Sequence, residues 1–570
     1  MKIKLICVCS LVMIKLSALT GQNALQIPPA LYGPVYDLNV QNGVVEFIPG
    51  ITTPTYGING NILGPTLFAD KGDVVTLNVT NSLTGTGNST TMHWHGFHLP
   101  ASADGGPHQV IDQGDTWSPS FTVMNDASTL WYHPHGDGKT DLQVARGLAG
   151  FFIIKDEVEN ALTLPRTYGV DDIPLAIQTK AFDVLHQIAI ATEMDTLPMV
   201  NATVDAVADL PAQVVRLRLL NGSSMRTFHI GFDNNQLFYV IAGDGGLLSE
   251  PVALNRLILA PGERYEILVD LSGMESEVLT MMSFGSTLPS GMYGAANPSG
   301  MGMGTITGYD ANPLNGSDFS LLKIQVIDQT ADPVTEIPSS LTPPITTPAY
   351  TATRVFNLEP ESMGMDNMVM GPFVINGASF NMDIVNEIVP INTIEKWRIN
   401  NNTGIAHPFH IHEGQFIIDN INGAEPDPVD RGMQDVVYIP AGQYAEVIKT
   451  FSDFADDQVP YMYHCHMLHH EDDGMMGSFT VVAQDEVIND HIVPPLIYPN
   501  PVASNSTFSI VTEGEFERME IYNSMGEIVY LDDFHQQAVN AYTIDGLPSG
   551  VFIIKLINGK NDNATTFIVQ

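Results

Sequence analysis

The sequence predicts an all-β protein made of three consecutive β-sandwiches followed by a smaller β-sandwich at the C-terminal end. Charged residues are only 15 % of the 570-residue chain, whereas Gly (49) and Pro (37) are abundant, which favours short strands joined by turns. Apolar and polar residues alternate between these turns, as in half-buried antiparallel strands. A chain of this length also exceeds what one core can fill, so several domains are expected.

Three segments of the chain repeat one plan, and each is expected to form one sandwich. Each segment begins with a turn that carries an asparagine: Asn59, Asn201 or Asn376. An alternating strand that ends in asparagine follows, over 75–81, 215–221 and 397–400. A later glycine turn precedes another alternating strand, with Gly114, Gly262 and Gly442 in this place. The repeats place the sandwiches at 25–160, 165–330 and 345–485, with a Pro/Thr-rich linker at 337–353.

The N-terminal residues 1–21 are predicted to be a signal peptide, because Lys2 and Lys4 precede a mostly apolar run that ends in small residues. No later stretch is long and apolar enough to be expected to span a bilayer. Cys7 and Cys9 would leave with the signal peptide, so the exported chain would keep only Cys465. A single cysteine cannot form an internal disulfide, and Cys465 is therefore a candidate for another role.

The composition is strongly acidic, with 23 Lys and Arg against 64 Asp and Glu and a net charge of −41. Such a surface repels nucleic acid and anionic membranes and attracts cations. We therefore expect an exported acidic protein without a nucleic-acid partner. A role of the charge in drawing metal ions or cationic substrates is the alternative.

Histidines occur in pairs with one residue between them. Chance would place about half of one His-x-His pair among 17 histidines, but the chain has four: His93/His95, His133/His135, His410/His412 and His464/His466. On a strand, residues i and i+2 face the same side, so each pair presents two imidazoles together. Neutral imidazole binds copper, zinc, iron or nickel. The pairs predict a multi-metal site.

The last histidine pair flanks Cys465 and narrows the choice of metal. A blue copper centre needs two imidazoles, one thiolate and a weak axial thioether. Cys465, His470 and Met475 supply three of these ligands from one strand and the loop after it, and His407 is the candidate for the fourth. The side chains of His464 and His466 face away from that of Cys465. An electron that reaches the thiolate could therefore pass through a few bonds to whatever the two histidines bind.

These motifs, in this order over residues 30–485, resemble those of the multicopper oxidase family, which includes laccases, bilirubin oxidases and bacterial copper-efflux oxidases. The resemblance implies cupredoxin-like Greek-key sandwiches with one type 1, one type 2 and two type 3 copper ions. It implies these type 1 ligands: His407, Cys465, His470 and Met475. It implies this type 2 pair: His93 and His410. It implies these type 3 ligands: His95, His133, His135, His412, His464 and His466. The trinuclear cluster would lie between the first and third sandwiches. The middle one would serve as a spacer, because its repeat retains only His229 at the positions of the histidine motifs.

The resemblance also implies an enzyme that oxidises a small reducing substrate and reduces O2 to water. Because that reduction consumes protons, Asp104 and Glu471 are candidate proton donors. An acidic solvated loop at Glu471, or carboxylates that only orient imidazoles, are the alternatives. Methionines cluster at Met363, Met365, Met368 and Met370, and thioethers suit Cu(I), although methionine is also an ordinary core residue. The donor therefore stays open among phenols, aminophenols, bilirubin-like pigments and Cu(I).

Residues 495–570 form a short β-rich segment without a metal-ligand cluster. Its Tyr-Pro-Asn-Pro opening at 498–501 and its strand at 547–552 resemble the C-terminal sorting domain of the type IX secretion system. The resemblance implies export through the periplasm to the cell surface or the medium, with the secretion machinery as a partner. Two other functions remain open for the chain as a whole, a copper nitrite reductase and a non-enzymatic copper-sequestration protein.

Overall fold

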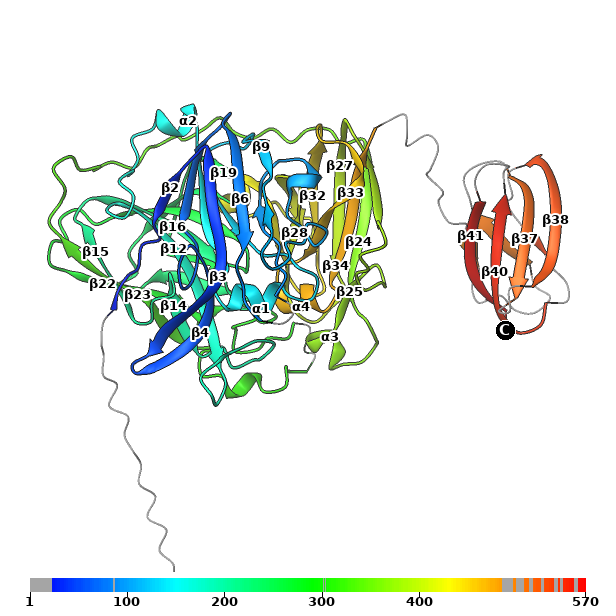
Figure 1. The fold of residues 1–570 in the computed structure, drawn as a ribbon, viewed down its shortest axis with the longest axis horizontal. Coiled ribbons are helices and arrows are strands. Elements are labelled where there is room, and N and C mark those ends of the chain that lie inside the picture. The colour runs from blue at the N-terminus through cyan, green and yellow to red at the C-terminus, as the bar shows by residue number, and fades with distance from the viewer. Residues whose placement is uncertain are drawn as a thin grey trace, which may run out of the picture. The chain divides into compact units, whose positions relative to one another are not determined.

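The computed structural model divides the chain into two compact units, one ending at Val481 and the other beginning at Val482. The residues it describes are 23–85, 88–300, 302, 304–483, 496–498, 507–511, 516–523, 527–537, 542–543, 547–557 and 562–569. The predicted signal peptide at 1–21 lies outside them. The chain is all-β, as predicted, and its helices are short pieces between strands (Figure 1).

The first sandwich packs a five-stranded sheet against a second sheet. The first sheet has the order β2 (Ala30–Tyr32), β5 (Thr66–Asp70), β11 (Gly150–Lys155), β10 (Ser128–His133) and β7 (His93–His95). The second has the order β4 (Ile51–Ile58), β3 (Val35–Ile48), β6 (Val74–Asn81) and β8 (Thr116–Trp117), with β9 (Ser120–Thr122) also paired to β6. Leu38 and Val79 meet Leu130 and Phe152 in the core between the two sheets. Alternation along each strand places these side chains inside.

The second sandwich begins with the first residues that the structure describes. One sheet has the order β1 (Asn23–Ala24), β15 (Ala206–Pro211), β23 (Asp318–Ile327), β22 (Val278–Phe284), β17 (Phe228–Phe232) and β20 (Arg256–Leu259). The other has the order β13 (Ile188–Ala189), β12 (Asp172–Phe182), β16 (Val214–Asn221), β21 (Arg264–Asp270), β18 (Phe238–Gly243) and β19 (Gly246–Leu254), with β14 (Leu197–Val200) on β12. Leu217 and Ile267 face Leu279 and Ile324 in the largest apolar core among the described residues.

The third sandwich carries the sequence motif around Cys465. One sheet has the order β25 (Phe373–Ile375), β24 (Ala352–Pro360), β27 (Thr393–Asn401), β32 (Tyr444–Phe451), β29 (Phe416–Ile421) and β30 (Met433–Gln434). The other has the order β26 (Glu387–Pro390), β34 (Met476–Val482), β33 (Asp456–Cys465), β28 (His407–Ile411) and β31 (Val436–Ile439). Trp397 and Phe356 pack against Tyr463 and Phe409 between them.

The helices are short, and two of them join the first and third sandwiches. The helices are α1 (Thr140–Ala145), α2 (Glu157–Asn160), α3 (Asn367–Met370) and α4 (Leu468–Asp472). Helices α1 and α4 lie side by side (Figure 1). The Asp472 carboxylate accepts the backbone N–H groups of Thr140 and Asp141, both at 2.9 Å. This contact holds the loop that follows Cys465 against the first sandwich.

The repeated asparagine turns have one conformation in all three sandwiches. Asn59, Asn201 and Asn376 adopt left-handed backbone angles, with φ of 57°, 48° and 52°. Asparagine tolerates this region because its side chain bonds locally. In each case the side-chain oxygen accepts a backbone N–H from a strand of the same sandwich. The threefold plan of the sequence therefore reflects a threefold structural unit.

The asparagine at the end of each repeated strand is buried, and its side chain links several segments by hydrogen bonds. The side-chain amides of Asn81, Asn221 and Asn401 each donate to carbonyls on two other segments, and each side-chain oxygen accepts the N–H two residues later. The prediction that the third strand ends in this way at Asn400 is therefore wrong by one residue. Three consecutive asparagines at 400–402 make the alternation ambiguous at that point.

Replacing Asn221 with alanine is expected to destabilise the protein by at least about 3 kcal/mol, since each buried polar group left unpaired costs about 1–3 kcal/mol. The substitution would strand the carbonyls of Arg226 and Leu259 and the N–H of Ser223. Scanning calorimetry should show a lower unfolding temperature. The exposed Asn402 is the matched control, and its alanine variant should unfold at the wild-type temperature. Equal shifts in both variants would contradict this role.

The C-terminal unit is a small β-sandwich, as predicted. One sheet has the order β35 (Leu496–Tyr498), β36 (Thr507–Val511) and β39 (Tyr542–Thr543), and the other has the order β38 (Ile528–Gln537), β37 (Phe516–Asn523), β40 (Gly550–Ile557) and β41 (Asp562–Val569). Met519, Ile521, Ile554 and Leu556 are buried. Residues 499–501 of the predicted opening motif lie outside the described residues. Within the part of the chain that is described, no helix has the length and apolar composition that crossing a membrane requires.

Candidate metal centre

The side chain of Cys465 lies between two imidazoles in the core of the third sandwich. Strand β28 pairs with β33 so that Phe409 is opposite Cys465, which places His407 near the sulfur. The Cys465 Sγ is 3.4 Å from Nδ1 of His407 and 3.7 Å from Nδ1 of His470. Met475 is buried in the same core, and its carbonyl accepts the N–H of Cys465 at 3.1 Å. The four residues predicted as one centre thus come from adjacent segments.

This sulfur site has the chemistry of a metal site rather than of an ordinary core cysteine. Burial raises the pKa of the Cys465 thiol, so a thiolate here needs a compensating cation. His407 is oriented by Thr403, whose hydroxyl lies 2.8 Å from Nε2 and in turn donates to the Asn401 side chain at 2.7 Å. Nδ1 of His407 therefore carries its lone pair toward the sulfur. Thiolate and imidazole together suit copper.

The remaining predicted histidines converge at the contact between the first and third sandwiches. Their ligand atoms form groups within 4.8 Å of one another: His93, His95 and His410; His95, His133 and His466; and His135, His412 and His464. Strands β7 and β10 pair directly, which brings the first two histidine motifs together, and β28 pairs with β33, which brings the last two together. Each of the eight histidines in the four His-x-His pairs is in at least one group.

Hydrogen bonds set the direction of most of these imidazoles. In six of the eight rings, one nitrogen faces an oxygen atom, and the other nitrogen is free to face the other histidines of its group. The oxygen partners are Asp104 O for His93, Asp435 Oδ1 for His95, Pro134 O for His133, Asp435 O for His410, Asp104 Oδ2 for His412 and Cys465 O for His464. Such outer contacts fix the tautomer of a metal-binding histidine.

The inward-facing nitrogens have the arrangement that a shared cation would explain. The Nε2 atoms of His135 and His464 are 3.1 Å apart, and that of His412 is 3.4 Å from His464 Nε2. The buried Nε2 atoms of His93, His410 and His466 have no hydrogen-bond partner in the described chain. Burial lowers the pKa of His412 to about 4 and that of His466 to about 3. Neutral rings with converging lone pairs fit metal ions.

The two predicted carboxylates lie beside these histidines but in different electrostatic settings. Asp104 accepts Nδ1–H of His412 at 2.7 Å. Burial alone would raise the pKa of Asp104, but the electrostatic interactions and hydrogen bonds with His412 and His93 outweigh it and lower that pKa. Glu471 lies 3.2 Å from Nδ1 of His464. Burial raises the pKa of Glu471, and the Asp472 carboxylate raises it further. Asp104 is thus an ionised acceptor, whereas Glu471 favours its protonated form.

Two residues of the site had no signal in the sequence. Asp435 receives hydrogen bonds from His95 and His410, but it stands alone before β31 and belongs to no spaced motif. Thr403 is visible in the sequence only as a position near His407. Both act through the orientation of an imidazole, which depends on contacts between distant segments.

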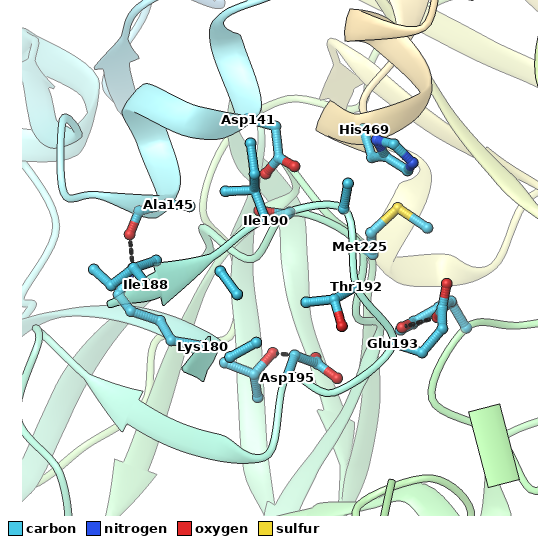
Figure 2. A pocket seen from close by; sticks show the side chains of 16 residues that line it. Asp141, Ala145, Lys180, Ile188, Ile190, Thr192, Glu193, Asp195, Met225 and His469 are labelled. Atoms are coloured by element: carbon cyan, nitrogen blue, oxygen red, sulfur yellow. Dashed lines mark hydrogen bonds between the residues drawn. The ribbon is translucent and has the colours of Figure 1, made fainter. Parts of the chain in front are cut away.

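An opening of about 580 Å³ reaches the edge of His470, which lies next to Cys465. Met194, Met225 and Met370 line it together with Glu193 and His469. A smaller neighbouring pocket shares several of these residues, and Figure 2 shows Met225, His469 and Glu193 on one side of it. Met370 belongs to the predicted methionine cluster, whereas Met363 and Met365 are 88 % and 67 % exposed and do not line the opening.

Family models agree with this architecture in each part of the chain. Models described as multicopper oxidase match residues 39–159, 191–290 and 351–485. A model described as a secretion system C-terminal sorting domain matches residues 496–570.

Individual proteins are similar over most of the chain. A multicopper oxidase of Staphylococcus aureus is 34 % identical over 457 residues, covering 78 % of this chain and 88 % of its own. The cell division protein FtsP of Escherichia coli is 31 % identical over 476 residues, covering 82 % and 94 %. The laccase-like multicopper oxidase CueO of Ochrobactrum sp. has a solved structure with a TM-score of 0.69 and 32 % identity, covering 80 % of this chain and all of that one. The multicopper oxidase McoA of Aquifex aeolicus gives 0.70 and 29 %, covering 81 % of this chain and all of its own.

Proposed function

The chain belongs to the multicopper oxidase family of oxidoreductases, and on that premise we propose that it oxidises a reducing donor one electron at a time and reduces O2 to two waters. Four electrons and four protons balance this reduction. His407, Cys465, His470 and Met475 would hold a type 1 copper. His93 and His410 would hold a type 2 copper. His95, His133, His135, His412, His464 and His466 would hold a type 3 pair. Bound copper would supply the redox chemistry both at the Cys465 site and at the histidine groups.

One observation carries the proposal, namely the placement of three consecutive residues at the end of β33, where His464 and Cys465 are the last two residues of the strand and His466 follows directly. Cys465 Sγ belongs to the group with His407 and His470, while His464 and His466 belong to two of the histidine groups. The peptide chain thus joins the two sites through a few covalent bonds. A protein that only stored copper would not need this link, and a nitrite reductase would not need the second and third histidine groups.

The chain's own residues account for donor access and proton supply. His470 lies between the opening and Cys465, so a donor in the opening would reach the sulfur site through its imidazole. Glu471 follows His470 and contacts His464, so a protonated Glu471 is placed to deliver a proton toward the histidine groups. Asp104, as an ionised acceptor, keeps His412 oriented and is placed to pass on a proton from it.

Copper content and O2 uptake test the proposal together. The purified protein loaded with copper should be blue from its thiolate–copper bond and should consume O2 when an aminophenol or Cu(I) is added. Two waters rather than hydrogen peroxide should form, as measured with a peroxide assay. Nitrite consumption without O2 uptake would favour a nitrite reductase, and copper binding without turnover of any donor would favour sequestration. A copper-loaded protein without blue absorption would contradict the sulfur site.

We propose Cu(I) as the donor that best suits the opening. Met194, Met225 and Met370 offer soft thioethers, and Glu193 adds a negative charge. The net charge of −41 would draw a cation toward the protein. Phenols, aminophenols and bilirubin-like pigments are the other outcomes of the test.

Replacing Met225 and Met370 with leucine is expected to raise the KM for Cu(I) about tenfold, equivalent to about 1.4 kcal/mol of binding free energy, with little effect on an aminophenol. The steady-state rate of O2 uptake measures both donors. Leucine in place of the exposed Met363 and Met365 is the matched control and should leave both rates unchanged. Equal losses for both donors in the pocket variant would show a packing role and argue against Cu(I).

The C-terminal unit indicates where the protein acts in or outside the cell. Its match to a secretion sorting domain suggests export to the cell surface or the medium, with the secretion machinery as partner. Deleting residues 496–570 should leave the oxidase in the periplasm, which fractionation and immunoblotting would detect. Unchanged export of the shortened chain would contradict this role.

A further inference from the structure

The middle sandwich contacts the histidine groups directly and is more than the spacer expected from its lack of ligands. Arg264, the first residue of β21, is fully buried. Its guanidinium binds both oxygens of Asp435 in the third sandwich, with Nη1–Oδ1 and Nη2–Oδ2 distances of 2.6 Å. A two-pronged, charge-assisted pair of this kind fixes the plane of the carboxylate as well as its position.

Asp435 in turn orients imidazoles from two sandwiches. Its Oδ1 accepts Nε2–H of His95 at 2.9 Å, and its backbone carbonyl accepts Nδ1–H of His410 at 2.7 Å. The carboxylate that Arg264 clamps is therefore the one that directs the lone pairs of His95 and His410 inward. One continuous chain of hydrogen bonds runs from the second sandwich through the third to the first.

Every N–H group of the Arg264 guanidinium has a hydrogen-bond acceptor. Nε–H donates to Thr129 O at 3.1 Å, and the second hydrogens of Nη1 and Nη2 donate to the carbonyls of Gly262 and Asp244. With the two bonds to Asp435, all five guanidinium donors have acceptors. The Asp244 carboxylate also accepts the N–H of Arg264 at 2.8 Å and that of Val436 at 3.1 Å. A lysine could make only some of these contacts.

A second contact from the same turn sets the place of His466. Neither ring nitrogen of His466 has a hydrogen-bond partner in the described structure, so packing has to position the ring. Gly262, with φ of 86°, lies against it, and a Cβ at Gly262 would come within 2.7 Å of His466 Cγ. The glycine that marks the repeated turn in the sequence thus has an additional use in the middle sandwich, where it leaves room for a histidine of the third.

We infer that the turn and strand start at Gly262 and Arg264 are positioning elements for the O2-reducing centre, with Arg264 acting on His95 and His410 through Asp435 and Gly262 acting on His466. This inference rests on the proposed function, since it assumes that these histidines bind copper. The middle sandwich would then be required for assembly of a site to which it gives no ligand.

Arg264→Lys tests the first part, with copper itself as the probe. Outer-shell changes typically cost about 10–100-fold in metal affinity. We expect such a loss at the histidine groups, seen by competition with a chelator and as a weakened or altered type 2 signal in electron paramagnetic resonance. The blue absorption should stay at the wild-type value per chain. Arg218→Lys is the matched control, because Arg218 is also buried in the middle sandwich and bonds Thr129 Oγ1, but pairs with Asp172 and Glu266.

Wild-type copper affinity and spectrum in Arg264→Lys, or equal losses in Arg218→Lys, would overturn the role of Arg264. Gly262→Ala provides an independent measurement if the arginine variant does not fold. It should disturb the absorption and magnetic coupling of the type 3 pair. Gly114→Ala is its control, since Gly114 has φ of 92° and no atom within 4 Å of the added Cβ. Equal effects of the two alanines would overturn the role of Gly262. If the wild-type protein binds no copper at its histidines, the proposed function fails before any variant is compared.

Discussion

Replacing Cys465 with serine is expected to abolish the blue absorption and all measurable donor-driven O2 uptake. The sulfur lies 3.4 Å from His407 and 3.7 Å from His470, and serine removes the only thiol in the described chain. A hydroxyl is a poor ligand for Cu(I) and supplies no thiolate-to-copper absorption. The substitution is nearly isosteric, so the core around Tyr463 should stay packed. Absorption spectroscopy and an oxygen electrode measure the two losses.

The same variant separates the two metal sites. His464 and His466 are unchanged, so the type 2 signal in electron paramagnetic resonance and the copper bound at the histidine groups should persist. Thr480, a buried hydroxyl residue on the neighbouring strand β34, offers a control, and Thr480→Ser should keep the blue colour and the activity. Wild-type turnover by Cys465→Ser would contradict the proposed electron route.

Replacing Glu471 with glutamine is expected to slow O2 reduction by about 10²–10⁴-fold, the range in which a positioned proton donor contributes. Glutamine keeps the shape and the contact with Nδ1 of His464 but cannot release a proton. Burial and the neighbouring Asp472 carboxylate raise the pKa of Glu471, so the native side chain favours its protonated form before each transfer. The change should slow the reaction of the reduced protein with O2 and leave the oxidation of the donor unchanged.

Stopped-flow measurements distinguish the two halves for this variant. Anaerobic bleaching of the blue absorption by the donor should proceed at the wild-type rate, whereas its return on mixing with O2 should be slow. Asp473→Asn is the matched control, because Asp473 directly follows α4 but its side chain is 45 % exposed and its ion pair is with His469 at 3.6 Å. Slower bleaching, or an equal effect of Asp473→Asn on reoxidation, would show that this acidic segment acts through packing or surface charge.

The methionine cluster shows where residue spacing was insufficient. Met363, Met365, Met368 and Met370 are close in sequence, but only Met370 of these lines the opening at His470. Met225, from the middle sandwich, lies there instead and belongs to no cluster in the sequence. Methionines that line one opening from two different sandwiches have no regular spacing along the chain, because they meet only after the sandwiches pack.

The candidate ligands, in contrast, could be identified from the sequence because their spacing is local. Each His-x-His pair and Cys465 were marked by their immediate neighbours. The expectation that each pair lies on one strand holds only for His93 and His95, because His135, His412 and His466 follow the ends of β10, β28 and β33. The repeated asparagines and glycines likewise marked the all-β sandwiches, since a left-handed turn restricts the residue at that position. Only the ambiguous run at 400–402 displaced the expected strand end by one residue.

By itself the sequence determined the all-β class, the repeated unit and the residues able to bind metal, since each follows from contacts between near neighbours in the chain. Only the tertiary structure decided which histidines converge in one group, that the pKa values of Asp104 and Glu471 are shifted in opposite directions, and that Arg264 reaches Asp435 across a domain boundary. These properties depend on burial and on distances between segments more than a hundred residues apart. Desolvation and hydrogen-bond geometry arise only when those segments meet, and no local pattern encodes them.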